Sequence, residues 1–203
     1  ANCVIRRARV VGENAVIVET GMTANVYVID KSKKRLTELH EQFGDKIIPT
    51  ESDKTDLKKL ITECDLLVGG VLIPGAEAPK LVTKEMIKSM KRGSVVVDVA
   101  IDQGGCIETS KPTTHANPTY LVNDVVHYCV ANMPGGVPRT STMALNKATL
   151  PLLLLLAEQG YKKTLTENKN YLAGLNVYRG KITYKGVSDA LKLKYSNPTN
   201  LLD

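Results

Sequence analysis

Short apolar segments that alternate with helical segments constrain the fold of this 203-residue chain more than any other feature. The apolar segments are rich in valine and isoleucine and are bounded by glycine, proline, aspartate or lysine, which predicts strands at Cys3–Ile5, Val26–Ile29, Lys46–Ile48, Asp65–Val68 and Ser94–Val99. Segments with helical periodicity lie between them, at Ser32–Gln42, at Thr55–Glu63 and from Thr83 toward Gly93. Strands that alternate with helices predict βαβ units, so we expect an α/β fold with a doubly wound parallel sheet covered on both faces.

The pattern changes after residue 134, where we expect the α/β domain of residues 1–134 to end. A long helix is predicted over Thr140–Gln159, and its middle reads Leu150, Pro151 and then five leucines. A helix that is apolar nearly all round is buried on several sides, yet this chain offers no obvious partner for it. The other elements predicted for residues 135–203 are a helix from Lys162, a hairpin with Arg179–Gly180 at its turn and a helix around Val187–Leu191.

The net charge of +6 and the pI near 9.1 would permit nucleic-acid binding, but the distribution of the basic residues argues against it. Lysines and arginines are scattered, apart from one short cluster at Lys31, Lys33, Lys34 and Arg35. Tryptophan is absent and there is a single phenylalanine, so the chain has no aromatic platform on which bases could stack. We therefore expect no nucleic-acid partner.

Cysteine spacing and hydropathy argue against a metal site and a membrane segment. The cysteines are far apart, without CxxC spacing, and lie in or beside apolar runs as buried thiols do: Cys3, Cys64, Cys106 and Cys129. No signal-peptide pattern stands at the start, and the longest apolar run, Leu150–Ala157, is too short to cross a bilayer. We expect a cytoplasmic protein with no metal and no membrane partner.

The first 30 residues have the order of a dinucleotide-binding unit. A predicted strand at Cys3–Ile5 is followed by a turn at Arg7–Gly12, a helix after Glu13 and a second strand that ends at Asp30. A carboxylate at Asp30 would accept hydrogen bonds from the adenosine ribose and repel a 2′-phosphate, which favours NAD over NADP. The order therefore predicts a Rossmann-type sheet with a nucleotide site.

Basic residues beside Asp30 leave a second interpretation open. Arg35 and the lysines near it could pair with a 2′-phosphate, which would weaken the preference for NAD. The alternative is that they form the solvated face of a helix.

The turn itself departs from the G-x-G-x-x-G pattern. Arginine stands at the first two glycine positions, Arg7 and Arg9, and only the third glycine, Gly12, is present. The first glycine permits a tight turn and the second lets the backbone approach pyrophosphate, so each arginine adds a side chain where space is needed. Taken alone, this turn favours an α/β domain that binds no nucleotide.

Two long strings carry a resemblance to a known family. Residues 97–120 read VDVAIDQGGCIETSKPTTHANPTY, and residues 125–145 read VVHYCVANMPGGVPRTSTMAL. Here the sequence resembles alanine dehydrogenase, and from about residue 24 onward the resemblance is nearly gapless. The soluble subunit of proton-translocating transhydrogenase shares the fold but departs from the DQGG and HYCVANMPG wording.

The resemblance implies an activity, a cofactor and an assembly. Alanine dehydrogenases are two-domain, hexameric enzymes that oxidatively deaminate L-alanine to pyruvate and ammonia with NAD. Their substrate domain precedes the nucleotide domain and is missing here, and the helical segment of residues 135–203 would belong to that domain and pack on it.

The resemblance also assigns roles to residues near the nicotinamide. Asp102 follows a buried strand at its carboxyl end and matches the family's catalytic aspartate, which can orient water or the substrate ammonium and take part in proton transfer. The alternative is that Asp102 caps a helix before Gly104. Asn132 and Met133 match positions at the nicotinamide end, where an amide can fix the carboxamide group of the cofactor.

The remaining implied cofactor contacts lie along the adenosine side and the sheet edge. They are Val71 and Leu72 on the adenine and ribose path, Ser52 on the adenosine side, Lys111 at a basic position, and Val99 and Val130. A solvated lysine is the alternative for Lys111. His115 and His127 are not catalytic candidates, because the family's catalytic histidine lies in the other domain, and His127 is expected to be a buried structural histidine.

Departures from the family are clustered at Arg7, Arg9 and Thr23, where glycine is expected. Three hypotheses therefore stay open. The chain is part of an alanine dehydrogenase whose other half exists elsewhere, a transhydrogenase-like nucleotide subunit, or a remnant that keeps the fold without binding cofactor.

Overall fold

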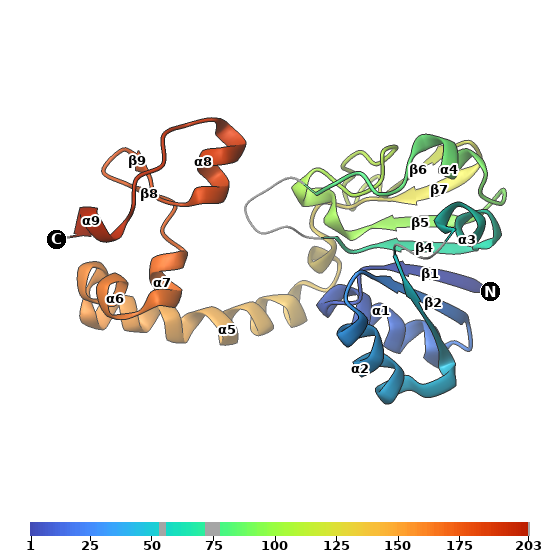
Figure 1. Cartoon of the computed structure of the whole chain (residues 1–203), viewed down its shortest axis with the longest axis horizontal. Coiled ribbons are helices and arrows are strands. Elements are labelled where there is room, and N and C mark those ends of the chain that lie inside the picture. The colour runs from blue at the N-terminus through green and yellow to red at the C-terminus, as the bar shows by residue number, and fades with distance from the viewer. Residues whose placement is uncertain (53–55, 72–77, 203) are drawn as a thin grey trace. The chain divides into compact units, whose positions relative to one another are not determined.

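The computed structural model describes residues 1–52, 56–71 and 78–202. The described chain forms two compact units, which Figure 1 shows in colours that follow the sequence. Residues 1–71 and 78–133 form the first unit, and residues 134–202 form the second.

A sheet is the centre of the first unit. Among the described residues it has seven strands in the order β3-β2-β1-β4-β5-β7-β6. These are β1 (Asn2–Arg6), β2 (Asn25–Asp30), β3 (Ile47–Glu51), β4 (Leu66–Gly69), β5 (Val95–Asp98), β6 (Thr119–Val122) and β7 (Val125–Tyr128). All neighbours pair in parallel except β6, which runs antiparallel to β7 at one edge. The predicted doubly wound α/β sheet is therefore confirmed, with an antiparallel edge strand that was not predicted.

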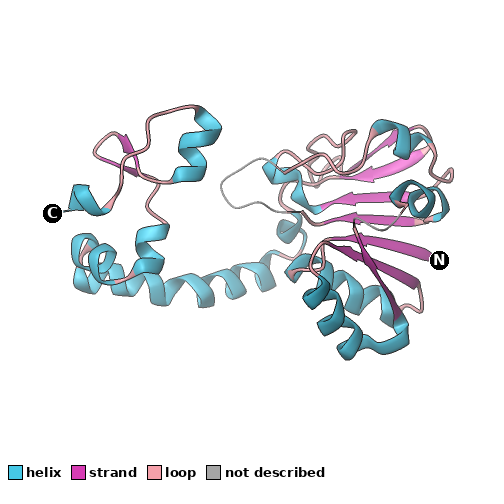
Figure 2. Cartoon of the chain, viewed as in Figure 1, coloured by secondary structure: helices cyan, strands magenta, loops and turns pink. Residues whose placement is uncertain are grey.

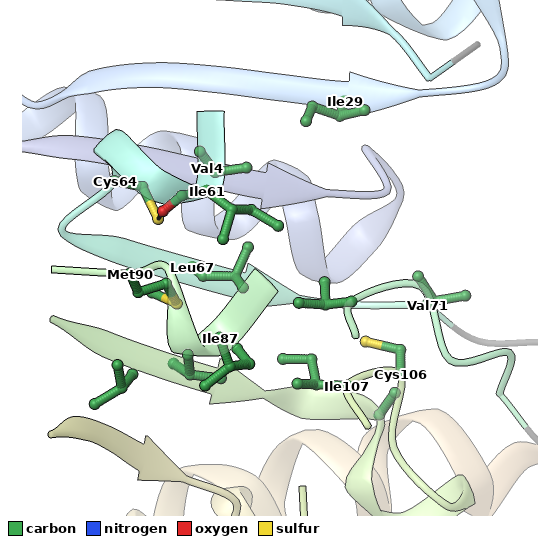
Figure 3. Packing of buried hydrophobic residues seen from close by; sticks show 14 of the residues in the cluster. Val4, Ile29, Ile61, Cys64, Leu67, Val71, Ile87, Met90, Cys106 and Ile107 are labelled. Atoms are coloured by element: carbon green, nitrogen blue, oxygen red, sulfur yellow. Dashed lines mark hydrogen bonds between the residues drawn. The ribbon is translucent and has the colours of Figure 1, made fainter. Parts of the chain in front are cut away.

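Helices cover both faces of this sheet. The helices are α1 (Val10–Gly21), α2 (Lys33–Phe43), α3 (Leu57–Glu63) and α4 (Lys84–Lys88), with short 3-10 turns η1 (Gly44–Lys46) and η2 (Val99–Gln103). One apolar cluster joins Val16 of α1 and Leu39 of α2 to alternate residues of β1 and β2. The other, drawn in Figure 3, joins Ile61 of α3 and Ile87 of α4 to Val4 and Leu67 on the opposite face. Buried alternation on both faces explains the Val- and Ile-rich strands.

Most helix starts follow the sequence signals, but α1 begins at Val10 rather than after Glu13, and helix ends follow the signals less well. Ser32 caps α2 by accepting a hydrogen bond from the Arg35 N–H at 3.3 Å, and Thr83 caps α4 in the same way. The helix after Thr83 was expected to reach Gly93, but α4 ends at Lys88 and a turn follows it. Thr55, expected to begin α3, lies outside the described residues, and Asp56 is the N-cap.

The second unit is mostly helical, as Figure 2 shows. After a short turn η3 (Met133–Gly136), which begins at the last residue of the first unit, its elements are α5 (Pro138–Gln159), α6 (Tyr161–Glu167), α7 (Lys169–Ala173), β8 (Val177–Tyr178), β9 (Lys181–Ile182), α8 (Lys185–Leu191) and α9 (Thr199–Leu202). Arg179 and Gly180 have φ of +48° and +75°, so the predicted hairpin turn is confirmed. Leu165 and Leu202 are among the few buried side chains of this unit.

The long helix α5 is exposed along its described length. None of its described residues is buried, and Leu145, Leu153 and Leu154 are each more than half exposed. This exposure agrees with the expectation that the chain itself offers no partner for the helix, and its burial against another domain stays a prediction. By length and composition, the 22 residues of α5 could also span a membrane, although a single helix of this kind is weak evidence for a membrane segment. The expectation that no segment is long enough to cross a bilayer, which came from the shorter run Leu150–Ala157, is corrected by this length.

Candidate functional site

The parallel strands of the first unit end at one edge of the sheet, and most of the predicted site residues follow them there. The edge gathers Gly12 after β1, Asp30 at the end of β2, Ser52 after β3, Val71 after β4, Val99 and Asp102 after β5, and Val130, Asn132 and Met133 after β7. Open α/β sheets bind ligands at this edge, where the strand order reverses between β1 and β4. Leu72 lies outside the described residues.

Two positions where glycine was expected have the left-handed backbone conformation that favours glycine, one in the turn after β1 and one just before β2. Arg7 has φ of +74° and Thr23 has φ of +61°, so two of the three expected glycine positions adopt the left-handed conformation. Arg9, in contrast, has φ of −87° and is the N-cap of α1. A Cβ on Gly12 would lie 2.1 Å from the Arg7 carbonyl oxygen, so only glycine lets α1 begin this close to the turn. Backbone strain therefore arises at Arg7 and not at Arg9.

Asp30 and Arg35 hold this turn through the backbone of Ala8. The Ala8 N–H donates to Oδ2 of Asp30 at 2.8 Å, and the Nε–H of Arg35 donates to the Ala8 carbonyl at 2.8 Å. The Ser32 N–H donates to Oδ1 of Asp30 at 2.8 Å. Each carboxylate oxygen of Asp30 keeps one lone pair, which could accept a ribose hydroxyl.

The guanidinium of Arg35 is held by two carboxylates. Its Nη2 lies 2.5 Å from Glu13 and its Nη1 lies 3.1 Å from Glu38. These hydrogen bonds, first that to Glu38, raise the pKa of Arg35 above its ordinary value. Arg35 is thus an internal clamp on the turn, a role that neither sequence interpretation of it included.

The first turn of α1 is left open at the sheet edge. Ser32, Asp56 and Thr83 cap α2, α3 and α4 through their side chains, but among the described residues no side chain caps α1. The first N–H groups of a helix have no partner within the helix, and together with the helix dipole they favour an anion. The geometry fits a phosphate group at this point.

A second loop, residues 99–107, curls around the buried carboxylate of Asp98. Asp98 is fully buried and accepts hydrogen bonds from the N–H groups of Cys106 at 2.9 Å, Ile107 at 3.1 Å and Ala100 at 3.2 Å. Gly105 has φ of +75°, and a Cβ there would lie 2.8 Å from Oδ2 of Asp98. The second glycine of the DQGG string, Gly105, is therefore required by the carboxylate that it lies against.

Asp102 lies within this loop, on η2, and its side chain is exposed. The N-cap of η2 is Asp98, so Asp102 does not cap a helix before Gly104. The loop is also held by Lys80, whose Nζ donates to the carbonyl oxygens of Gly104 and, at 2.8 Å, of Gly105. Sequence reasoning missed both Asp98 and Lys80, because their partners lie several to many residues away along the chain.

Histidines and Lys111 occupy the region beside the second loop. His127 is fully buried, donates from Nδ1 to the Val125 carbonyl at 3.0 Å and contacts Thr109 through Nε2 at 2.8 Å. Burial lowers its pKa, so it is a neutral structural histidine as predicted. His115 donates to the Asn132 carbonyl at 2.6 Å and so orders that segment. Lys111 makes a cation–π contact, with its Nζ 4.5 Å from the centre of the Tyr120 ring.

Buried groups under the site complete its surroundings. Arg6, at the end of β1, is only 8% exposed, and burial lowers its pKa while Asp30 and Cys106 act in the opposite direction. No pattern in the sequence predicted this buried cation. Burial raises the pKa of the Cys106 thiol to about 12, and all four cysteines are buried free thiols as predicted.

Comparisons with known proteins agree with this geometry. Residues 1–185 match the family model described as alanine dehydrogenase/PNT, C-terminal domain. The chain is 53% identical over 193 residues to an alanine dehydrogenase of Halomonas elongata, which covers 95% of this chain and 52% of that protein. A solved L-alanine dehydrogenase has a TM-score of 0.84 and 42% identity, over 95% of this chain and 53% of its own.

A more distant solved structure shares the same architecture. A transhydrogenase from Sinorhizobium meliloti has a TM-score of 0.71 and 25% identity, over 91% of this chain and 50% of its own. The chain therefore spans about half the length of the relatives that it matches.

Proposed function

Because the chain belongs to the alanine dehydrogenase/PNT C-terminal domain family, we propose that it is the NAD-binding part of an alanine dehydrogenase. The reaction is the reversible oxidative deamination of L-alanine to pyruvate and ammonia. The observation that carries this proposal is the sheet edge that brings together Asp30, the open first turn of α1 and the exposed Asp102. Greater likeness to alanine dehydrogenases than to the transhydrogenase favours deamination over hydride exchange between two nucleotides.

The chain's residues divide the cofactor between them. Asp30 accepts the hydroxyls of the adenosine ribose, with Ser52, Val71 and Leu72 on the adenosine side. The first turn of α1, which Gly12 lets begin close to the Arg7 carbonyl, binds the pyrophosphate. Val99, Val130, Asn132 and Met133 line the nicotinamide end. When bound there, NAD accepts a hydride from the α-carbon of the amino acid.

Asp102 is the group of this chain that handles protons. It is exposed on η2 and makes no hydrogen bond or ion pair with the other described residues, so its carboxylate is available to a ligand. From the end of β5 it can orient a water molecule or the substrate ammonium and accept a proton. Asp98 and Lys80 act through the loop backbone and position Asp102 without touching substrate.

A second domain must supply the groups that hold the amino acid. Residues 1–134 form the cofactor domain in this proposal, and residues 135–203 belong to the substrate domain. The exposed leucines of α5 would then pack on that domain or on another subunit, because an apolar surface of this kind favours association. The whole protein would be a cytoplasmic homo-oligomer, a hexamer like its family.

Cofactor binding is the direct test. We expect NADH, titrated into the protein by calorimetry, to bind at one site per chain. Asp30→Ala should weaken that binding at least tenfold through loss of the ribose contacts, about 1.4 kcal/mol. Asp45→Ala is the matched control, since Asp45 carries the same charge in the exposed turn η1 ahead of β3, and it should leave the affinity unchanged.

Turnover then separates the three hypotheses. With the substrate domain of the Halomonas elongata relative supplied as a second chain, NADH oxidation should require both pyruvate and ammonium. Hydride exchange with an NADP analogue that needs neither compound would favour the transhydrogenase-like subunit. If NADH did not bind at all, the chain would be a remnant without cofactor.

A further inference from the structure

We propose that Glu13 helps to set the cofactor preference of this site, because it holds the guanidinium of Arg35 in an ion pair and so keeps it from binding a 2′-phosphate. The inference rests on the proposed NAD site and adds a specificity residue to it. Glu13 lies one residue after Gly12 in the first turn of α1.

Arg35 lies close to the place where the 2′-phosphate of NADP would bind. Asp30, the acceptor for the ribose hydroxyls, and Arg35 both bond to the backbone of Ala8, each at 2.8 Å. In dinucleotide sites an arginine beside the ribose carboxylate accommodates the 2′-phosphate of NADP. A guanidinium in this place, if it were unpaired, would attract NADP.

Every nitrogen of this guanidinium already has a partner. Nε donates to the Ala8 carbonyl, Nη1 to Glu38 at 3.1 Å and Nη2 to Glu13 at 2.5 Å. The side chains of Arg35 and Glu13 are 26% and 31% exposed, so their contact is partly shielded from water. A phosphate would have to displace a charge-assisted hydrogen bond before it could use the arginine.

The charges around Arg35 oppose a phosphate as well. Two carboxylates, those of Glu13 and Glu38, flank the single positive charge of Arg35, and a third, that of Asp30, binds the same Ala8 backbone. Lys31 and Lys34 are exposed on the same segment, but they are present whatever stands at position 13. Loss of the Glu13 charge therefore changes the local balance in favour of a phosphate.

Glu38 contributes most to the raised pKa of Arg35, but Glu13 is the partner that lies beside the proposed cofactor. Its oxygen lies 2.5 Å from the guanidinium against 3.1 Å for Glu38, and it belongs to the first turn of α1, where we place the pyrophosphate. Glu38 is 44% exposed and pairs with Arg35 three residues away along α2, an arrangement that water screens more strongly.

The test compares NADPH and NADH affinities, by fluorescence titration, in the parent protein and three variants. Glu13→Gln keeps the size of the side chain and removes its charge, and it should raise NADPH affinity relative to NADH about five- to tenfold. Glu38→Gln removes the same charge from the same guanidinium and should change the ratio less than twofold. Glu13→Gln combined with Arg35→Gln should abolish the gain.

Each outcome decides between the two proposals. An unchanged NADPH-to-NADH ratio in Glu13→Gln, with NADH still bound, would overturn this inference and leave the NAD site intact. An equal gain in Glu38→Gln, or a gain that survives loss of Arg35, would overturn it too. Failure of the parent protein to bind NADH would overturn the proposed function, and this inference with it.

Discussion

Two loops at the same edge of the sheet are built on opposite plans. The loop of residues 99–107 folds around one buried carboxylate, Asp98, and uses glycines where φ is positive, +87° at Gly104 and +75° at Gly105. The turn of residues 7–12 is held from its rim by Asp30 and Arg35, and an arginine occupies its left-handed position. Glycine lets the loop of residues 99–107 close without strain. The turn of residues 7–12 keeps its shape through charged side chains that water reaches.

The difference indicates where each loop is vulnerable. A buried carboxylate that satisfies three N–H groups cannot be replaced by water, so its loss is costly. Partly exposed ion pairs contribute little each, and a strained residue can be relieved. The predictions below test this contrast in order of expected effect.

The largest effect is expected at Asp98. Asp98→Ala leaves the N–H groups of Ala100, Cys106 and Ile107 without their acceptor in a buried place, which should lower the free energy of unfolding by about 3–5 kcal/mol. Urea unfolding followed by circular dichroism measures this. The matched control is Asp102→Ala in the same loop, an exposed carboxylate whose removal should cost less than about 0.5 kcal/mol. Equal losses in the two variants would show that burial of Asp98 does not hold the loop.

The second effect concerns chemistry rather than folding. In a complete enzyme Asp102→Asn should lower alanine turnover about 100-fold or more and leave NADH affinity nearly unchanged, because the amide keeps the size but accepts no proton. Steady-state kinetics and NADH titration are compared on the same preparation. Unchanged turnover would make Asp102 a structural residue.

Local signals made the strands and helix starts predictable. Apolar strands such as β1 and β4 are buried on both faces, and Ser32 and Thr83 cap their helices through contacts within three residues. The edge strand β6 was missed because it is four residues long and half exposed, and only its pairing with β7 makes it a strand.

The location of the site could be predicted from the sequence, but the contacts that hold its loops could not. Strand ends located Asp30 and Asp102, since parallel strands end at one edge. The pairing of Arg35 with Glu13 spans 22 residues, and Asp98 meets Ile107 nine residues later, distances at which sequence spacing carries no signal. Charged residues that clamp a turn therefore look like a solvated face until the chain is folded.

A smaller effect comes from His127, which lies beneath the second loop. Burial lowers the pKa of His127 below its ordinary value of 6.5. Just below pH 6.5, therefore, the unfolded chain binds a proton at this residue more readily than the folded chain does. The contribution of His127 to stability is then fully present above about pH 6.5 and is lost as the pH falls below that value. His127→Gln should remove this part of the pH dependence of urea midpoints, whereas the exposed His115→Gln should keep it. If His127→Gln retained the full dependence, another group would be responsible.

The smallest expected effect separates the two arginines of the turn. Arg7→Gly relieves a left-handed residue, which costs about 1–2 kcal/mol, but glycine gives back about 0.5–1 kcal/mol through its freedom in the unfolded chain, so the net gain is about 0.5–1 kcal/mol. Arg9→Gly relieves no strain, since φ is already −87°, and should change stability by a few tenths of a kcal/mol at most.

NADH affinity should respond differently: both substitutions make room for pyrophosphate, and the double variant should bind NADH more tightly in calorimetry. Tighter binding together with a stability gain only at position 7 would show that strain and crowding are separate faults of this turn. Weaker binding in the double variant would make the arginines phosphate ligands, and a stability gain at position 9 equal to that at position 7 would contradict the assignment of strain to the left-handed backbone.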